Sequence, residues 1–335
     1  MELGWNKIIR HTNSGFAEKV SVVIAVRNES KNIETLMNHL AEQSYDSQLL
    51  EIIVVDDHST DDTYQKLLKY KNINVLKSNG QGKKMALDRG INLATGSVIL
   101  TTDGDCFFGK HWVRTMVKYF IDDSIKMVVG PVLLKATISS FFQKVQIIEF
   151  ASLIGSGAGA IANQQAFMCN GANLAFRSEY YKNTRNDVQS GDDVFLLHHI
   201  KSNGGKIVFA KDKRAIVSTN CKTDLKTFLQ QRIRWSAKSS SYNDLDAIKI
   251  SLAVFITNLT IVFSAFYDLS LLVILLTIKF LSDYPLLKKQ ASFFEIKKWK
   301  LNFLALQLIY PVYIVYIAMV SQFSTFYWKG RKFNK

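Results

Sequence analysis

Two carboxylates separated by one glycine follow an apolar, β-branched run in the segment VILTTDGDC, residues 98–106. Side chains alternate along a strand, so Asp103 and Asp105 can point to the same side, while Gly104 lets the backbone turn closely between them. Two such charges repel each other unless a cation lies beside them. Mg²⁺ and Mn²⁺ bind carboxylates together with phosphate oxygens. The spacing therefore predicts a divalent metal ion that bridges Asp103 and Asp105 to a diphosphate, although a D-x-D motif taken alone also occurs in solvated turns.

A second acidic pair, Asp56 and Asp57, ends the apolar run LEIIVVDD, residues 50–57. Ligands of open α/β sheets bind outside the carboxyl ends of the strands, so these carboxylates can accept hydrogen bonds from a nucleoside base or ribose. The alternative is that they serve the turn and the start of the next helix. Lys83 follows two glycines in NGQGKKMAL and can neutralise a phosphate, although a solvated surface lysine is the simpler interpretation of that residue alone.

A third acidic pair, Asp192 and Asp193, stands directly before a helix-like apolar pattern in QSGDDVFLLHHI, residues 189–200. An acid in this place can cap the helix. Beside a cation and a sugar it can instead act as a general base that accepts the proton of an attacking hydroxyl group.

The segment QQRIRW, residues 230–235, combines three kinds of ligand-binding side chain. On a helix, Gln231 and Arg234 share a face, with Trp235 beside them. Arginine presents planar donors to phosphate, and tryptophan offers a flat face to a sugar ring. The alternative is a basic helix that rests on lipid headgroups with Trp235 as an interfacial anchor.

These side chains need a scaffold of alternating strands and helices, and the first part of the chain predicts one. Short apolar runs at residues 20–26, 50–57, 73–77 and 97–103 are separated by polar-faced segments at residues 34–43 and 60–70. Strands that alternate with helices indicate βαβ units and a mostly parallel sheet. We therefore expect an α/β domain over residues 1–245, with its acidic residues at the carboxyl edge of the sheet.

The composition changes near Ile248, after which three long apolar stretches follow at about residues 251–267, 269–287 and 301–323. Each approaches the ~20 residues that cross a bilayer. We therefore expect a membrane domain over residues 246–335 with two or three transmembrane helices. The second stretch carries Lys279 and Asp283 and can be re-entrant or interfacial, and a buried helical subdomain is the alternative for all three.

Two earlier segments, at about residues 139–165 and 224–245, predict amphipathic helices in the headgroup region, although the first can equally be a core-facing helix. The lysine-rich loop KKQASFFEIKKWK, residues 288–300, favours a cytoplasmic position, and the first domain should share that side. The N-terminal segment has no apolar core of signal-peptide length, which argues against export of the first domain. The basic tail, residues 328–335, would lie outside after three crossings, so either one segment does not cross or the tail departs from the orientation rule.

The bulk composition agrees with a soluble part joined to a membrane part. The 335 residues carry a net charge of +14, and 48% of them are hydrophobic. Membrane-flanking lysines account for much of the positive charge, and the chain shows no aromatic-basic platform for nucleic acid, so we expect no nucleic-acid partner. Three cysteines lie far apart, which indicates neither a disulfide framework nor a zinc site.

In combination these segments resemble the membrane-anchored branch of the family-2 glycosyltransferases, which have a GT-A fold, a Rossmann-like and mostly parallel sheet. The resemblance covers about residues 19–238, in the family's order. SVVIAVRNES is similar to the opening strand, with Ala25, Arg27 and Glu29 at the nucleoside position, although the family usually has a proline and an aromatic residue where Ala25 and Arg27 stand.

The remaining motifs follow the same pattern. VVDDHSTDDT resembles the second nucleotide-binding element, with Asp56 and Asp57. GQGKKMAL resembles the lysine-bearing loop, with Lys83. TTDGDC resembles the metal motif, with Asp103 and Asp105, and the resemblance implies that Asp103 also contacts the nucleotide. NGANLAF resembles an acceptor loop with Gly171 and Asn173. SGDD matches the acid pair, with Asp192 in place of the commoner glutamate and Asp193 at the position of the base. The Q-x-x-R-W of cellulose, chitin and hyaluronan synthases and of ceramide glucosyltransferases matches Gln231, Arg234 and Trp235.

The resemblance implies an inverting transfer of a sugar from a nucleotide-diphosphate sugar, by default a UDP-sugar, to a hydroxyl group of a lipid or membrane-proximal acceptor. Asp193 would deprotonate the acceptor hydroxyl group. The metal ion, together with Lys83 and Arg234, would stabilise the leaving nucleoside diphosphate, and the ring of Trp235 would form the floor of the acceptor site. One alternative is a processive polysaccharide synthase, for which three or fewer spans leave little protein to build a channel. Another is a non-catalytic basic membrane adaptor that binds nucleotide or anionic lipid, against which the intact acidic residues argue. The expected location is the cell (inner) membrane, with the catalytic domain in the cytoplasm.

Overall fold

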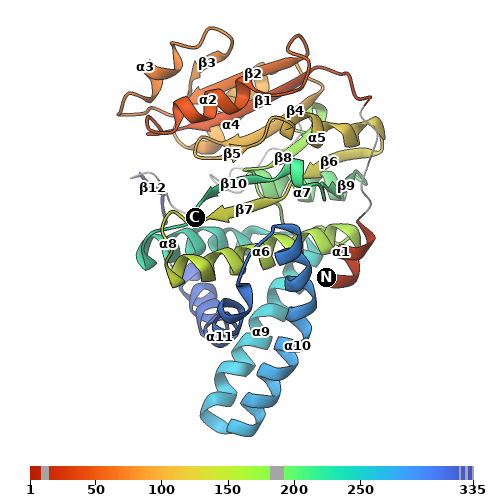
Figure 1. Cartoon of the computed structure of the whole chain (residues 1–335), viewed down its shortest axis with the longest axis vertical. Coiled ribbons are helices and arrows are strands. Elements are labelled where there is room, and N and C mark those ends of the chain that lie inside the picture. Colours follow the sequence, from red (N-terminus) through yellow and green to blue (C-terminus); the bar gives the residue numbers. More distant parts are fainter. Residues whose placement is uncertain (9–14, 182–191, 324–325, 329–330, 334–335) are drawn as a thin grey trace. The chain divides into compact units, whose positions relative to one another are not determined.

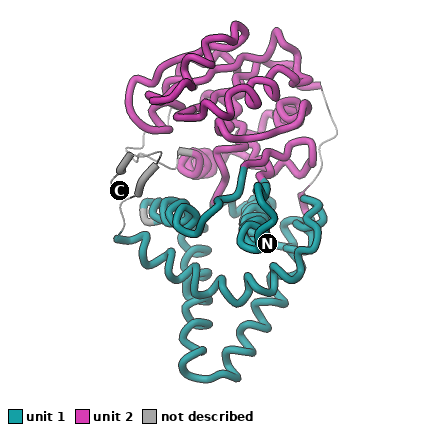
Figure 2. The backbone as a smooth tube through the Cα atoms, turned by 60° about the vertical axis from the view of Figure 1, so that its left-hand side comes forward, with its two compact units in different colours: residues 1–6, 133–167, 220–335 teal, residues 7–132, 168–219 magenta. Residues whose placement is uncertain are grey.

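The computed structural model describes residues 1–8, 15–181, 192–323, 326–328 and 331–333. The chain forms two compact units, and each of them is assembled from separate stretches of sequence (Figure 2). Unit 1 holds residues 1–6, 133–167 and 220–335, and unit 2 holds residues 7–132 and 168–219.

Unit 2 is built on a seven-stranded sheet with the order β3-β2-β1-β4-β8-β6-β9 (Figure 1). Its strands are β1 (Val20–Val26), β2 (Leu50–Asp56), β3 (Asn74–Lys77), β4 (Val98–Asp103), β6 (Ile125–Val129), β8 (Leu174–Arg177) and β9 (Lys206–Phe209). β1 pairs in parallel with β2 and β4, β2 with β3, and β6 with β9, whereas β8 is antiparallel to both of its neighbours. The prediction of a mostly parallel α/β sheet is confirmed.

The helices of unit 2 follow the strands along the chain. They are α2 (Ile33–Ala41), α3 (Thr63–Leu67), α4 (Lys83–Leu93), α5 (Trp112–Val117) and α7 (Asp192–Ser202), with 3₁₀ turns at η1 (Lys118–Ile121), η2 (Ser178–Tyr180) and η3 (Lys213–Ala215). A short strand, β5 (Phe107–Phe108), pairs antiparallel with β10 (Val217–Asn220). Helix α4 lies directly on the sheet, because a Cβ atom at Gly90 would come within 2.5 Å of Val23 and 3.0 Å of Val55. Lys83, the first residue of α4, reaches Asp103 at the end of β4.

Unit 1 is helical. It contains α1 (Glu2–Lys7), β7 (Val132–Lys135), α6 (Phe141–Ala162), α8 (Leu225–Ala237), η4 (Lys238–Ser241), α9 (Leu245–Tyr267), α10 (Leu269–Phe293), α11 (Trp299–Phe323) and the short antiparallel strands β11 (Phe326–Trp328) and β12 (Arg331–Phe333). α9 and α10 lie side by side as an antiparallel hairpin (Figure 1). Ile148 of α6, Leu287 of α10, and Phe303 and Leu306 of α11 form a buried apolar cluster.

Within the described part of the chain, four helices, α6, α9, α10 and α11, are long and apolar enough to cross a membrane by length and composition. The last three coincide with the expected spans. Only 17%, 6% and 28% of their most apolar stretches is buried within the protein, which leaves apolar surface for lipid to cover. The corresponding share of α6 is 67%, and α6 runs across the direction of α9 and α10 (Figure 1). α6 is therefore largely buried within the protein, as the core-facing alternative expects, and an interfacial position stays a prediction.

The division into units differs from the boundary that composition predicts near residue 246. α6 and α8 belong to unit 1 with α9–α11, because their apolar side chains pack against α10 and α11. The change in composition shows where the last three helices begin, whereas side-chain packing decides that α6 and α8 belong to the same unit.

The two charges within the second apolar stretch are paired inside unit 1. The ammonium of Lys279 lies 2.5 Å from Oδ2 of Asp283 and 2.9 Å from Oε1 of Gln307, whose amide nitrogen donates to Asp283 at 3.1 Å. Charged groups that satisfy each other cost far less in an apolar environment than isolated ones. α10 is one continuous helix over Leu269–Phe293, with Pro285 inside it. Its crossing of the membrane stays a prediction.

Candidate active site

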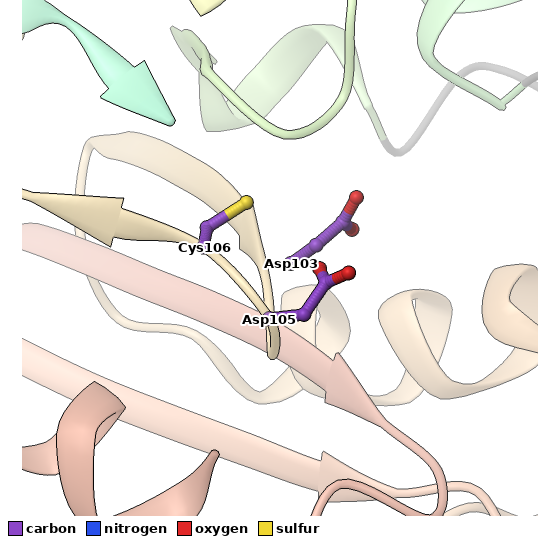
Figure 3. Close-up of side chains that lie close together, drawn as sticks. All are labelled: Asp103, Asp105 and Cys106. Carbon is purple, nitrogen blue, oxygen red and sulfur yellow. The ribbon is translucent and has the colours of Figure 1, made fainter. Parts of the chain in front are cut away.

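The D-x-D segment stands where strand β4 ends at the carboxyl edge of the sheet. Asp103 is the last residue of β4, and the N–H of Cys106 donates to its carbonyl oxygen, which closes a tight turn around Gly104. Asp103, Asp105 and Cys106 each offer one atom, and these atoms all lie within 4.8 Å of one another (Figure 3). The hydroxyl of Thr219 donates to Oδ2 of Asp105 at 3.3 Å. The two carboxylates are thus held together on one turn.

The donor set of this turn fits a hard divalent cation. Burial raises the pKa of the Cys106 thiol well above its usual value, and the charges of Asp103 and Asp105 raise it further, so Cys106 is a neutral thiol at neutral pH. The two carboxylates are then the charged ligands, and oxygen ligands of this kind suit Mg²⁺ or Mn²⁺. The ammonium of Lys83 lies 2.5 Å from Oδ1 of Asp103, which shows that the turn attracts positive charge.

Asp56, at the end of β2, has an oxygen that points to a ligand. The side chain is only 2% exposed, and Oδ2 accepts a hydrogen bond from the N–H of Ser59 at 3.1 Å. Oδ1 is buried and has no hydrogen-bond partner among the described residues. A buried carboxylate oxygen without a donor is costly, and an N–H or O–H group of a bound nucleoside would satisfy it.

Asp57 is turned toward the protein. It is fully buried, and its Oδ1 accepts from the N–H of Gly82 at 3.1 Å. Gly82 has a φ of 104°, a conformation that favours glycine, and it directly precedes Lys83. Asp57 therefore anchors the loop that carries the lysine.

The residues expected at the nucleoside position lie at the end of β1. Ala25 pairs directly with Asp103 in the β1–β4 register. The guanidinium of Arg27 donates to the carbonyl oxygens of Asp57 and His58, at 2.7 and 2.5 Å, so it ties the ends of β1 and β2 together. Glu29 accepts from Asn32 at 2.6 Å. A direct contact of any of these side chains with a nucleotide stays a prediction.

Asp193 and Gly171 come together from separate segments of unit 2. Oδ2 of Asp193 accepts from the N–H of Gly171 at 2.9 Å, and Oδ1 accepts from the N–H of Val194 at the start of α7. Asp192 is the first residue of α7, but its side chain, like residues 189–191 before it, lies outside the described part of the chain. Asp193 thus sits in a defined position at a helix start, as a general base requires.

Asn173, expected to meet the acceptor, is fully buried and holds the loop instead. Its amide oxygen accepts from the indole N–H of Trp112 at 2.9 Å, and its amide nitrogen donates to the carbonyls of Pro131 and Ala215, each at 2.8 Å. With both ends of the amide engaged inside unit 2, the part that Asn173 can play is to fix the segment that presents Gly171.

The Q-x-x-R-W segment forms the last turns of α8 in unit 1, whereas the acidic residues belong to unit 2. Arg232, for which no role was predicted, holds this motif in place. Its buried guanidinium lies 2.6 Å from Oε2 of Glu149, donates to Oε1 of Gln231 at 3.2 Å, and stands 4.2 Å from the ring of Trp235. The sequence signal for this pair is Glu149, a glutamate within the apolar helix α6, because a buried charge requires a partner of opposite charge.

Comparisons with known proteins agree on one family. Residues 21–185 match the model described as Glycosyl transferase family 2. The glycosyltransferase AglE of Haloferax volcanii is 32% identical over 118 residues, which are 34% of this chain and 39% of that protein. A poly-β-1,6-N-acetyl-D-glucosamine synthase of Staphylococcus aureus is 31% identical over 143 residues, which are 41% of this chain and 34% of that protein. The chain thus aligns with less than half the length of these relatives.

Among solved structures, the mannosyltransferase PcManGT of Pyrobaculum calidifontis, in complex with GDP-Man and Mn²⁺, superimposes with a TM-score of 0.61 at 16% identity. The match covers 96% of this chain and 92% of that one. A likeness at this level of identity shows that the fold is shared.

Proposed function

We propose that this chain, whose residues 21–185 match the model of Glycosyl transferase family 2, transfers a sugar from a nucleotide-diphosphate sugar to a hydroxyl group of a lipid or membrane-proximal acceptor. The observation that carries the proposal is the pair Asp103 and Asp105, held on one turn beside the ammonium of Lys83. Such a cluster of carboxylates and a cation is what a metal-bound diphosphate requires.

The donor half of the site uses three features of unit 2. Asp103 and Asp105 would hold a Mg²⁺ or Mn²⁺ ion, which supplies positive charge to the departing diphosphate when bound. Lys83 adds a second positive charge at the same edge. The unsatisfied Oδ1 of Asp56 accepts a hydrogen bond from an N–H of the base or an O–H of the ribose, because a buried oxygen gains most from such a donor.

The acceptor half depends on Asp193. Its carboxylate accepts the proton of the acceptor hydroxyl, whose oxygen attacks the anomeric carbon from the face opposite the diphosphate, so the configuration inverts. The Gly171 N–H, 2.9 Å from Oδ2, orients the carboxylate for this role. The roles expected of Asp192, Gln231, Arg234 and Trp235 stay predictions, to be tested by the activity of their variants.

The donor is best sought among the sugars that the similar proteins name. One S. aureus relative is a poly-N-acetylglucosamine synthase, and the similar structure holds GDP-Man with Mn²⁺. UDP-N-acetylglucosamine, as the UDP-sugar, and GDP-mannose are therefore the first donors to test. The apolar helices of unit 1 favour an acceptor in or near the membrane, with the domain on the cytoplasmic side of the cell membrane.

The test is a donor screen with purified protein in detergent and Mn²⁺, which scores released nucleoside diphosphate with and without membrane lipid extract. We expect release that depends on both Mn²⁺ and lipid extract. Asp193→Asn should abolish release while the donor still binds in titration calorimetry, and Asp46→Asn, at an exposed acid of unit 2, serves as the control. Unchanged turnover of Asp193→Asn would remove Asp193 from the mechanism.

The same screen separates the two rival functions. A ladder of oligomeric products would show a processive synthase in place of a single transfer. Binding of donor or anionic lipid without release of nucleoside diphosphate by the unaltered protein, with every donor tested, would favour a non-catalytic membrane adaptor.

A further inference from the structure

Strand β4 carries a second polar residue next to the metal motif. Thr101 stands two residues before Asp103, so both side chains emerge on the same face of the strand. Thr101 is only 5% exposed, and its hydroxyl donates to the carbonyl oxygen of Gly171 at 2.8 Å. A buried threonine hydroxyl in a strand thus holds a loop that lies far away in the sequence.

Gly171 connects this hydroxyl to the base. Its carbonyl oxygen accepts from Thr101, and its N–H donates to Oδ2 of Asp193 at 2.9 Å. The two contacts flank a single Cα atom. A Cβ atom at Gly171 would lie 3.4 Å from Oδ2 of Asp193, so the loop and the carboxylate are in close packing contact there.

The rest of the loop is fixed by other bonds. The N–H groups of Ala172 and Asn173 donate to the side chain and the carbonyl oxygen of Asn170, each at 3.0 Å. The buried amide of Asn173 anchors the end of the loop to Trp112 and two carbonyls. Within this anchored segment, the hydrogen bond from Thr101 ties the carbonyl oxygen of Gly171 to strand β4.

We propose that Thr101 is a positioning residue that orients the Asp193 carboxylate through Gly171. This inference rests on the proposed function, because it assigns Thr101 a role toward the proposed base. Strand β4 then fixes both halves of the reaction, the donor through Asp103 and the acceptor base through Thr101. Precise placement matters because a shift of about 1 Å in a reacting group can lower a rate about 100-fold.

The test compares Thr101→Val, which keeps the shape but removes the donor, with Thr101→Ser, which keeps the donor. Hydrogen–deuterium exchange of the Gly171 amide is followed in the full-length protein in detergent. We expect faster exchange in Thr101→Val, near-normal exchange in Thr101→Ser, and the fastest exchange in Asp193→Ala, which removes the acceptor of that amide. Thr115→Val, which removes a buried hydroxyl from α5, is the matched control and should leave the Gly171 amide unchanged.

Kinetics and binding give the second measurement. In Thr101→Val the turnover number for release of nucleoside diphosphate should fall about 10- to 100-fold, while the affinities for UDP and Mn²⁺ stay within twofold of the unaltered protein. Thr101→Ser should restore most of the turnover.

The outcomes distinguish the two proposals. If Asp193→Asn is inactive while Thr101→Val has normal Gly171 exchange and normal turnover, the positioning role is wrong and the proposed function stands. If Asp193→Asn transfers sugar normally, the base assignment fails, and the role of Thr101 toward it fails as well. A loss of UDP affinity in Thr101→Val equal to its loss of turnover would show a general disturbance of β4 and would also overturn the positioning role.

Discussion

At the scale of single residues, the contact between Lys83 and Asp103 sets up a competition. The ammonium lies 2.5 Å from Oδ1 of Asp103, an oxygen that we propose for the metal ion. Because the ammonium competes for this oxygen, Lys83→Met should tighten the binding of Mn²⁺ alone by about two- to fivefold, the value of a solvent-accessible ion pair. It should also weaken the binding of UDP with Mn²⁺ about tenfold, because a charge-assisted bond to phosphate is lost.

Titration calorimetry with MnCl₂, and then with UDP in excess Mn²⁺, measures both effects. Lys84→Met, at the next position of α4, is the control. Opposite signs for the two affinities would support the competition, and a parallel decrease of both would contradict it.

Contacts within one segment could be predicted from the sequence, whereas contacts between distant segments could not. The placement of Asp103 and Asp105 on one turn follows from strand alternation and a glycine, both of which are local. The burial of Asn173 is not local, because Trp112, Pro131 and Ala215 reach it from three other segments. Arg27 likewise forms hydrogen bonds to the end of β2, which no pattern within β1 can show. The residue types at these positions suggested ligand contacts. The structure shows that Arg27 and Asn173 also hold the framework of unit 2, and a contact of Arg27 with a nucleotide stays a prediction.

At the scale of elements, the buried pair of Arg232 and Glu149 joins α8 to α6. Their side chains are 5% and 9% exposed, and the guanidinium also contacts the rings of Phe228 and Trp235. Removal of one partner leaves an uncompensated buried charge, which costs about 3–5 kcal/mol. We therefore expect Arg232→Met to lower the midpoint of thermal unfolding in detergent markedly.

A second substitution provides the control for this pair. In Glu149→Leu/Arg232→Met no charge is left unpaired, and such replacements are often neutral for stability. We expect the double variant to recover most of the lost thermal stability. A double variant that is less stable than Arg232→Met would show that the pair itself, and not its charge balance, stabilises the helices.

The loop before α3 gives a prediction for acid. Burial alone would raise the pKa of Asp61, but hydrogen bonds from Thr63 and Ser30 lower it to about 2. The usual pKa of an unfolded aspartate is about 3.9, so the carboxylate stabilises the fold above about pH 4 and loses that contribution as the pH falls toward 2. The difference in melting temperature between the unaltered protein and Asp61→Asn should therefore shrink between pH 5 and pH 2.5. A difference that stays constant over this range would contradict the role of the charge.

Most elements of the sheet could be predicted because their signals are local. The runs predicted at residues 20–26, 50–57, 73–77 and 97–103 became β1–β4 with ends shifted by at most one residue. Helix α3 is shorter than the expected 60–70, because the Asp61 and Thr63 contacts turn the first residues into a loop. The strands β6, β8 and β9 were not predicted. The antiparallel place of β8 between β4 and β6 depends on pairing between distant segments, which leaves no periodic pattern in the sequence.

At the scale of the whole molecule, the two units alternate along the sequence, so each of them is built from separate stretches of the chain. Unit 1 takes residues from the start, the middle and the end of the sequence, and its α1 contributes the buried Trp5, which packs on Phe293 of α10. A linear boundary near residue 246 describes the composition but not this assembly. Because α6 and α8 pack with the apolar helices, the unit that holds the candidate membrane spans is larger than the C-terminal segment alone.

The ends of α10 test the expected membrane orientation. Its 25 residues extend about 37 Å, which exceeds a hydrocarbon core of about 30 Å, so Asp268 before α10 and Lys297 after it should face opposite sides. Lysines 288, 289, 297, 298 and 300 surround the later end, whereas residues 262–276 contain no lysine or arginine. Since lysine-rich loops stay in the cytoplasm, Lys297→Cys should react with an impermeant maleimide only in inside-out vesicles, and Asp268→Cys only in intact cells.

Both positions are exposed and the native cysteines are buried, so the unaltered protein is the unreactive control. Labelling of Lys297→Cys in intact cells would reverse the orientation, and labelling of both variants from one side would show that α10 does not cross.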